Sequence, residues 1–198
     1  MKKGESKTGF TIIEVVLVLA VAGLIFVMVF IALPALQRAQ RDNSRRDTLM
    51  NIVSQVKRYQ QSNRGALPGS SDTLNTTADV VRVEPDEGGN VTGSSTSTKW
   101  AGFYKDYLLT SKNFIDPDGS YYNLAVMLCN NSVVEDSACT GYRDWLTGLP
   151  DTSFPNDHRI IVVLQAKCKN TEAVGSSNPR NLAVIYRLEG SGAYCFNT

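Results

Sequence analysis

The feature that most constrains this chain is an apolar run near its N-terminus. From Phe10 to Leu36 every side chain is apolar or small, apart from Thr11, Glu14 and Pro34. A helix of about 20 apolar residues crosses a bilayer, so this run is long enough to span one. The presence of Glu14 within this run requires an explanation, because a carboxylate at the centre of a membrane helix costs about 2.5 to 3.5 kcal/mol.

The position of Glu14 indicates where its partner comes from. It lies four residues after Phe10. If the chain were cut between Gly9 and Phe10, the new amino terminus would lie at the same depth in the membrane and would neutralise the carboxylate. An ionisable group inside a membrane span is interpreted first as functional, with a charged partner.

A leader that contains lysines is followed by Gly9, then by the segment 10–14 and an uninterrupted apolar helix. This N-terminal region resembles the class III signal of type IV pilins and pseudopilins. The resemblance implies that a membrane prepilin peptidase cuts after Gly9 and methylates the amine of Phe10. It also implies that Glu14 meets the terminal amine of a neighbouring subunit in a filament, with Thr11 in the same assembly motif. Beyond the first helix no equally specific motif appears.

The same resemblance implies an α+β fold, with a long N-terminal helix packed on a C-terminal antiparallel sheet. We expect a leader over 1–9, a transmembrane and filament-core helix over 10–36, and a globular head over 37–198. The expected partners are further copies of the chain, the prepilin peptidase, the pilus assembly platform, membrane lipid before assembly, and minor pilins. The subunit would first span the inner membrane with a cytoplasmic N-terminus and then join an extracellular pilus.

Three other interpretations stay open: a pseudopilin or minor pilin, a DNA-uptake pilin, and an uncut signal-anchored binding protein. A pseudopilin of a secretion system, or a minor pilin, would share the whole N-terminal region. An uncut signal anchor carrying an extracellular binding domain belongs to a different class of protein. A cleaved secretory signal fits less well, because its apolar part usually spans 7–15 residues and ends at a small-x-small site. Whether a pilus would serve motility, adhesion or DNA uptake does not follow from the sequence.

Charge gives little indication of a nucleic-acid partner. Twenty Lys and Arg against nineteen Asp and Glu leave a formal net charge of +1. A DNA-uptake pilin needs an exposed basic patch, which only Lys99, Lys105 and Lys112 offer, so DNA binding is not supported. The charges on the two flanks of the apolar run also leave its orientation undecided by the positive-inside rule.

Four cysteines, all in the distal part of the chain, predict two disulfides. An even number in an exported domain favours disulfides, and no two cysteines have the short spacing of a zinc site. Of the three possible pairings we prefer Cys129 with Cys139 and Cys168 with Cys195. Such bonds place the head outside the cytoplasm.

The first helix should continue past the apolar run as an amphipathic helix over 37–63. Its apolar positions recur at helical spacing, and the basic residues, Arg45 and Arg46 among them, fall mostly on other faces. A stop signal follows at Asn63-Arg64-Gly65. Gly23 and Pro34 weaken the helix by about 1 and 3 kcal/mol, which predicts either a simple kink or a span that melts on assembly. The apolar positions are Leu49, Ile52, Val53, Val56 and Tyr59.

The next segment, 65–99, is rich in Gly, Ser, Thr and Asn, and we expect a variable surface loop with at most a short strand at 80–83. It holds two of three glycosylation sequons, which begin at Asn75, Asn90 and Asn130. A short helix over 100–111 should pack its aromatic side chains into the core. Stacking of these aromatic side chains on DNA bases is not favoured, because no basic cluster accompanies them in the sequence.

The sheet is expected over 120–198. Strand candidates are 121–129, 159–167, 181–189 and 193–197, and Gly190-Ser191-Gly192 marks a hairpin between the last two. Their β-branched, apolar composition suits a sheet face buried against the first helix. We expect an antiparallel meander, which needs no crossovers.

No catalytic motif appears, and we expect neither a catalytic residue nor a cofactor or metal. His158 has no nucleophile motif near it and is interpreted as a surface histidine. Asp116 and Asp118 lie in a turn-forming segment. They are too few for a calcium site, which needs six to eight oxygen ligands, so a turn is favoured.

Overall fold

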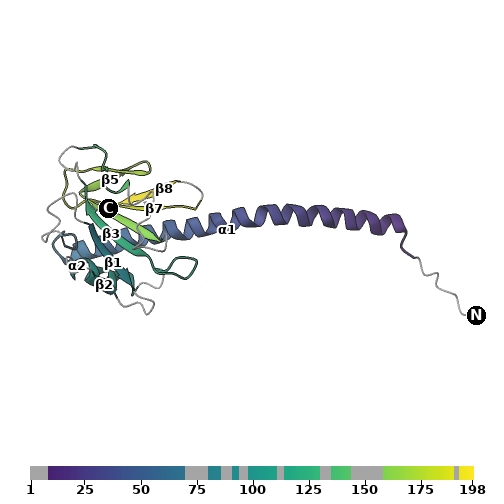
Figure 1. Cartoon of the computed structure of the whole chain (residues 1–198), viewed down its shortest axis with the longest axis horizontal. Coiled ribbons are helices and arrows are strands. Elements are labelled where there is room, and N and C mark those ends of the chain that lie inside the picture. Colours follow the sequence, from purple (N-terminus) through teal and green to yellow (C-terminus); the bar gives the residue numbers. More distant parts are fainter. Residues whose placement is uncertain are drawn as a thin grey trace, which may run out of the picture. The chain divides into compact units, whose positions relative to one another are not determined.

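The structure is a computed structural model that describes residues 9–69, 80–85, 91–93, 98–110, 114–129, 135–143, 158–189 and 192–198. The chain divides into two compact units, Met1–Gln40 and Arg41–Thr198. The first contains the N-terminal part of helix α1, and the second contains the rest of α1 and all the strands (Figure 1). The predicted sequons begin at residues outside the described ranges.

Helix α1 spans Ile12–Ser62, 51 residues. It ends where the sequence predicts, because Arg64 and Gly65 adopt left-handed conformations with φ of 55° and 83°. The amide of Gly65 then donates to the carbonyl of Gln60 at 2.7 Å and satisfies one of the last helical acceptors. Glycine suits that position because it carries no Cβ to oppose a positive φ.

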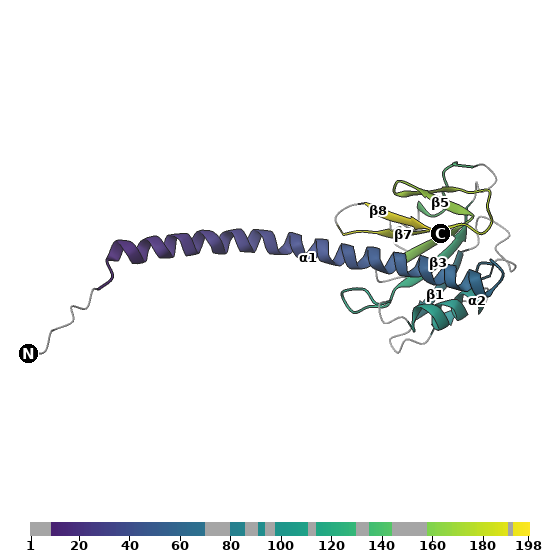
Figure 2. The same ribbon diagram turned by 180° about the vertical axis from the view of Figure 1, so that it is seen from behind.

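The second unit is built on a six-stranded sheet in the order β2-β1-β3-β4-β7-β8. All neighbouring pairs are antiparallel except β3 and β4, which run parallel. Figure 2 shows this sheet from behind. The strands are β1 Val80–Pro85, β2 Val91–Gly93, β3 Asn123–Leu128, β4 Arg159–Leu164, β7 Leu182–Arg187 and β8 Ala193–Asn197.

Residues 41–62 of α1 lie on one face of the sheet, together with α2 (Thr98–Phe103) and the π-helix η1 (Tyr104–Leu108). Trp100, Phe103 and Tyr104 are buried there, so the aromatic helix packs into the core as predicted. The hydroxyl of Tyr104 donates to the carbonyl of Tyr122 at 2.6 Å. The buried positions of α1 that meet the sheet include Leu49, Ile52, Val53 and Val56.

The opposite face of the sheet has its own, smaller core, covered by the hairpin of β5 (Ala166–Lys169) and β6 (Glu172–Gly175). The sequence predicted one strand over 159–167. It is instead interrupted at Gln165, whose φ of 54° ends β4 and sends the chain back over the sheet. Alternate residues of β4 therefore serve the two cores, with Ile160 and Val162 on the helix side and Ile161 and Val163 on the hairpin side.

The α+β layout with an apolar N-terminal helix and an antiparallel-rich sheet is confirmed, with two corrections. The purely antiparallel meander is wrong, because β3 and β4 pair in parallel; a parallel pair requires a crossover connection rather than a tight hairpin. The range 65–99 is not only a loop, because it supplies β1 and the edge strand β2. These strands form by backbone pairing, because β1 pairs with β3 and β2 pairs with β1.

Candidate functional site

The beginning of α1 is organised by a reciprocal hydrogen-bonded pair. The amide of Glu14 donates to the hydroxyl of Thr11 at 3.3 Å, while the Thr11 amide and hydroxyl both lie 3.4 Å from Glu14 Oε2. This is a capping box, in which an N-cap hydroxyl and an acid three residues later satisfy free amides at the helix start. Gly9 and Phe10 precede the cap and are exposed.

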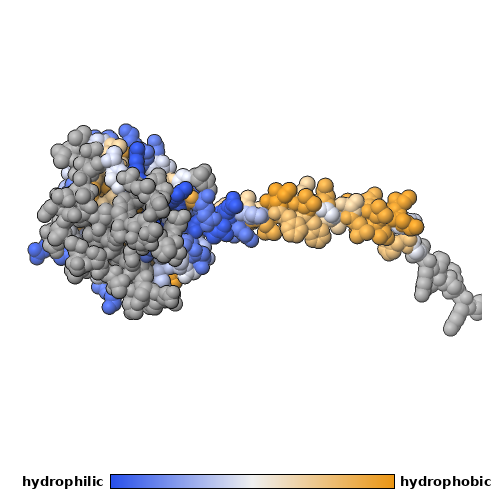
Figure 3. Space-filling model, viewed as in Figure 1, coloured by the Kyte–Doolittle hydropathy of each residue, from blue (hydrophilic) through white to orange (hydrophobic). Residues whose placement is uncertain are grey.

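The apolar run of α1 has no covering protein surface in the described chain. All its large apolar side chains between Phe10 and Leu36 are exposed, with Phe10 at 85% and Phe30 at 73%. Figure 3 shows this part of α1 mostly in orange. Among the described residues, α1 is the helix that is long and apolar enough to cross a membrane. It therefore indicates membrane anchoring or a signal sequence.

Gly23 and Pro34 both lie within α1, which is continuous through them. A Cβ added at Gly23 would meet no atom within 4 Å, so no close contact explains the glycine. The predicted kink or melting at these two positions stays a prediction.

The second unit contains a buried ion-pair cluster that was not predicted from the sequence. Arg45, predicted to lie mostly away from the core, is 6% exposed. Its Nε and Nη2 donate to the two carboxylate oxygens of Asp116 at 2.8 and 3.0 Å, and Nη1 donates to Glu189 at 2.7 Å. Asp116 is completely buried. Burial disfavours the charged form of Arg45, but the hydrogen bonds outweigh it and the pKa of Arg45 is raised.

Glu189 joins a second arginine of α1 to this cluster. Arg41 donates through Nε and Nη2 to the two Glu189 oxygens at 2.9 and 2.8 Å. These hydrogen bonds, together with those from Arg45, lower the pKa of Glu189 to about 2. A carboxylate held in this way tethers the end of β7 to residues 41–45 of α1.

The lowered pKa predicts an acid-dependent loss of stability. Glu189 contributes its full stabilisation above its ordinary pKa of 4.5, and the contribution is lost as the pH falls through about 2. We therefore expect the difference in unfolding free energy between the wild type and Glu189→Gln to shrink between pH 5 and pH 2, measured by denaturant unfolding of the full chain in detergent. The control is Glu172→Gln, at an exposed ion pair with Arg143. An unchanged wild-type-to-Gln difference at pH 2 would contradict the assignment.

His158 extends the cluster to the start of β4. Its Nδ1 lies 3.4 Å from Asp116 Oδ2 and its Nε2 lies 2.8 Å from Asp118 Oδ2. The side chain is 14% exposed, so the interpretation as a surface histidine is wrong. The reason is tertiary: the backbone pairing of His158 with Asn123, at 2.8 Å, places the ring beside the aspartate turn.

The turn predicted at Asp116 and Asp118 is present. The amide of Gly119 donates to the carbonyl of Asp116 at 2.8 Å, and Gly119 has a φ of 92°. Both carboxylate oxygens of Asp116 are already engaged by Arg45. The pair of aspartates is therefore poorly suited to a shared calcium ion, which requires free oxygen ligands.

The structure joins Cys129 to Cys139 and Cys168 to Cys195, the pairing preferred from the sequence. The first bond closes a loop beside β3, and the second ties β5 to the edge strand β8. Both belong to the core on the hairpin side of the sheet. Two disulfides indicate an extracellular location for the head.

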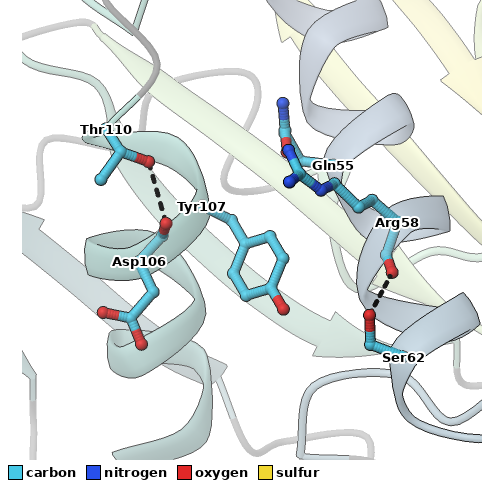
Figure 4. A pocket seen from close by; sticks show the side chains of 6 residues that line it. All are labelled: Gln55, Arg58, Ser62, Asp106, Tyr107 and Thr110. Atoms are coloured by element: carbon cyan, nitrogen blue, oxygen red, sulfur yellow. Dashed lines mark hydrogen bonds between the residues drawn. The ribbon is translucent and has the colours of Figure 1, made fainter.

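A shallow groove of about 610 Å³ lies between the end of α1 and η1. Its lining is polar, and Figure 4 shows the ring of Tyr107 between the two helices. The hydroxyls of Ser62 and Thr110 donate to the backbone carbonyls four residues earlier in the chain. Lys99 and Lys105, considered above for DNA, are exposed on α2 and η1, and Lys112 lies outside the described residues. The groove is lined by Gln55, Arg58, Ser62, Asp106, Tyr107 and Thr110.

Comparisons with family models, with curated proteins and with solved structures found no match for this chain. The functional interpretation therefore depends on two features of the molecule. These are the exposed apolar helix with its capped glutamate, and the disulfide-bonded head, in which Arg45 of α1 makes a buried ion pair and Arg41 a more exposed one.

Proposed function

We propose that this protein is the structural subunit of a type IV pilus. In this proposal residues 1–9 are removed, Phe10 is methylated, and the apolar part of α1 assembles with its copies in a filament core. The observation that carries the proposal is the continuous exposed apolar surface of α1, which begins beside an acid at Glu14. Such a surface is stable only against lipid or against other apolar helices.

Assembly exchanges one apolar environment for another. In the bilayer the side chains of α1 contact lipid, and in a filament they would contact the same helix of neighbouring subunits. Packing and polar pairing, rather than the hydrophobic effect, then decide the association, as for helices within membranes. Glu14 is the acid available within this surface to specify an axial register.

The capping box supports a role for the first turn in this pairing. The carboxylate of Glu14 lies 3.4 Å from the Thr11 amide, one residue beyond Phe10. An α-amine created at Phe10 of a neighbouring copy can reach the same exposed carboxylate without a change in the helix. The pairing would remove an uncompensated charge from a dry core, where leaving one costs about 3–5 kcal/mol.

Processing provides the direct test. We expect Gly9→Val to block cleavage, so that the chain isolated from its own cells keeps residues 1–9. The wild type should begin at methylated Phe10. Intact-protein and N-terminal peptide mass spectrometry measure both.

The matched control is Gly23→Ala, a glycine of the same helix whose added Cβ meets nothing within 4 Å. It should be processed as the wild type is. A wild-type chain that retains Met1 to Gly9 would instead identify an uncut signal-anchored protein. Electron microscopy of sheared surface material then distinguishes long pili from the short filaments of a pseudopilin.

A further inference from the structure

We propose that His158 and Asp118 form a binding site for a divalent transition metal such as Zn²⁺. The two ligand atoms would be His158 Nε2 and Asp118 Oδ2, which lie 2.8 Å apart. This inference is independent of filament assembly, because the site lies entirely within the second unit. Asp116, Asp118 and His158 have ligand atoms within 4.8 Å of one another.

The distance between the two atoms suits ligands of one ion. Zinc binds imidazole nitrogen at about 2.0–2.1 Å and carboxylate oxygen at about 2.0–2.2 Å, so two such ligands on one ion lie about 3 to 3.4 Å apart. A small rotation of the Asp118 side chain, which is 47% exposed, opens the gap to that distance. The same exposure admits the ion and the water molecules that complete its coordination.

The histidine is held in the orientation that a metal ligand needs. Its backbone carbonyl accepts from Asn123 at 2.8 Å, and its Nδ1 is buried facing Asp116 Oδ2 at 3.4 Å. Asp116 is itself fixed by the two donors of Arg45. A carboxylate on the far side of a ligating imidazole favours the proton on Nδ1, and the ion would replace the direct contact of Nε2 with Asp118 Oδ2.

The ring nitrogen on the other side of His158 faces Asp116 rather than the proposed ion. Nδ1 of His158 is buried and makes no hydrogen bond among the described residues, an arrangement that normally costs stability. An ion on Nε2 would draw electron density from the ring and make the Nδ1 proton a stronger partner for Asp116.

The carboxylate ligand is oriented as well. Oδ1 of Asp118 accepts from the amide of Ser120 at 2.9 Å and from the Ser120 hydroxyl. This leaves Oδ2 directed at His158. An imidazole with one carboxylate suits zinc, nickel or copper, whereas calcium and magnesium prefer sites made of oxygen ligands.

The chain makes the test unusually specific. His158 is its single histidine, and its four cysteines are all used in the two disulfides. The full chain, purified in detergent without a histidine tag, is titrated with Zn²⁺ by calorimetry and by NMR of the one imidazole ring. We expect one ion per chain, a shift of the His158 ring signals, and a rise in the unfolding temperature, because the ion links the turn to β4. Calcium at the same concentration should have no effect.

Two variants and a control decide the outcome. Asp118→Asn keeps an oxygen for Ser120 but loses the charge, and should weaken zinc binding at least about tenfold. His158→Gln should abolish it. Asp106→Asn, an exposed acid of η1, should bind as the wild type does. The proposal is overturned if zinc leaves the ring signals unmoved, or if Asp118→Asn binds zinc as tightly as the wild type. The result for Asp118→Asn decides even where His158→Gln fails to fold.

Discussion

Glu14→Gln is expected to impair filament assembly strongly while leaving processing and membrane insertion intact. Glutamine at this position can still complete the capping box with Thr11, so the helix start is preserved. What is lost is the negative charge that would pair with the Phe10 amine of a neighbour. We expect at least about a tenfold fall in sheared filaments, because a lost contact of about 1.4 kcal/mol already lowers an association constant tenfold. Immunoblotting and electron microscopy measure the filaments.

Thr11→Val is the matched control, because it keeps the charge of Glu14 and removes the capping hydroxyl. Loss of an N-cap costs about 0.5–2 kcal/mol of helix stability, so this variant should assemble in reduced but measurable amounts. If Glu14 serves only as a cap, the order is reversed: Thr11→Val fails and Glu14→Gln assembles normally. Abundant filaments from Glu14→Gln would show that assembly does not require the negative charge of Glu14.

Arg45→Met is expected to destabilise the head by about 3–5 kcal/mol. The substitution leaves Asp116, which is completely buried, without the two hydrogen bonds that compensate its charge. Breaking a buried ion pair from one side costs this much because the remaining charge stays desolvated. Methionine retains most of the length of the side chain, so the effect reports the charge rather than a cavity. Denaturant unfolding of the full chain in detergent measures it.

Two further variants separate this effect from general sensitivity to losing an arginine. Arg143→Met removes an exposed ion pair with Glu172, whose partners are 47% and 52% exposed, and should cost at most about 1 kcal/mol. Adding Asp116→Asn to Arg45→Met removes the stranded charge and should restore part of the stability. A loss for Arg45→Met no larger than that for Arg143→Met would show that the buried pair contributes little.

The elements that were predicted well have local causes. The end of α1 follows from a glycine that takes a positive φ, and the burial of Ile52 and Val56 follows from helical spacing. Strand β8 was predicted at its observed bounds, Ala193–Asn197, because the turn that precedes it is marked by glycines. The strands that were missed, β2 and β6, are three and four residues long, too short for an alternating pattern, and they exist because a neighbouring strand supplies their hydrogen bonds.

The sequence by itself determined the membrane-length helix, the place of Glu14 within it, the number of disulfides and most of the strands, because each follows from composition or from the local pattern of residues. Only the tertiary structure decided that β3 and β4 run parallel, and that Arg45, Asp116 and His158 meet at one place. Arg45 looked like a solvated charge because spacing reports which face of a helix a residue lies on, whereas the acids that make its burial tolerable come from distant segments. A charged side chain such as Arg45 can be buried only together with its ion-pair partner, and the tertiary fold brings that partner beside it.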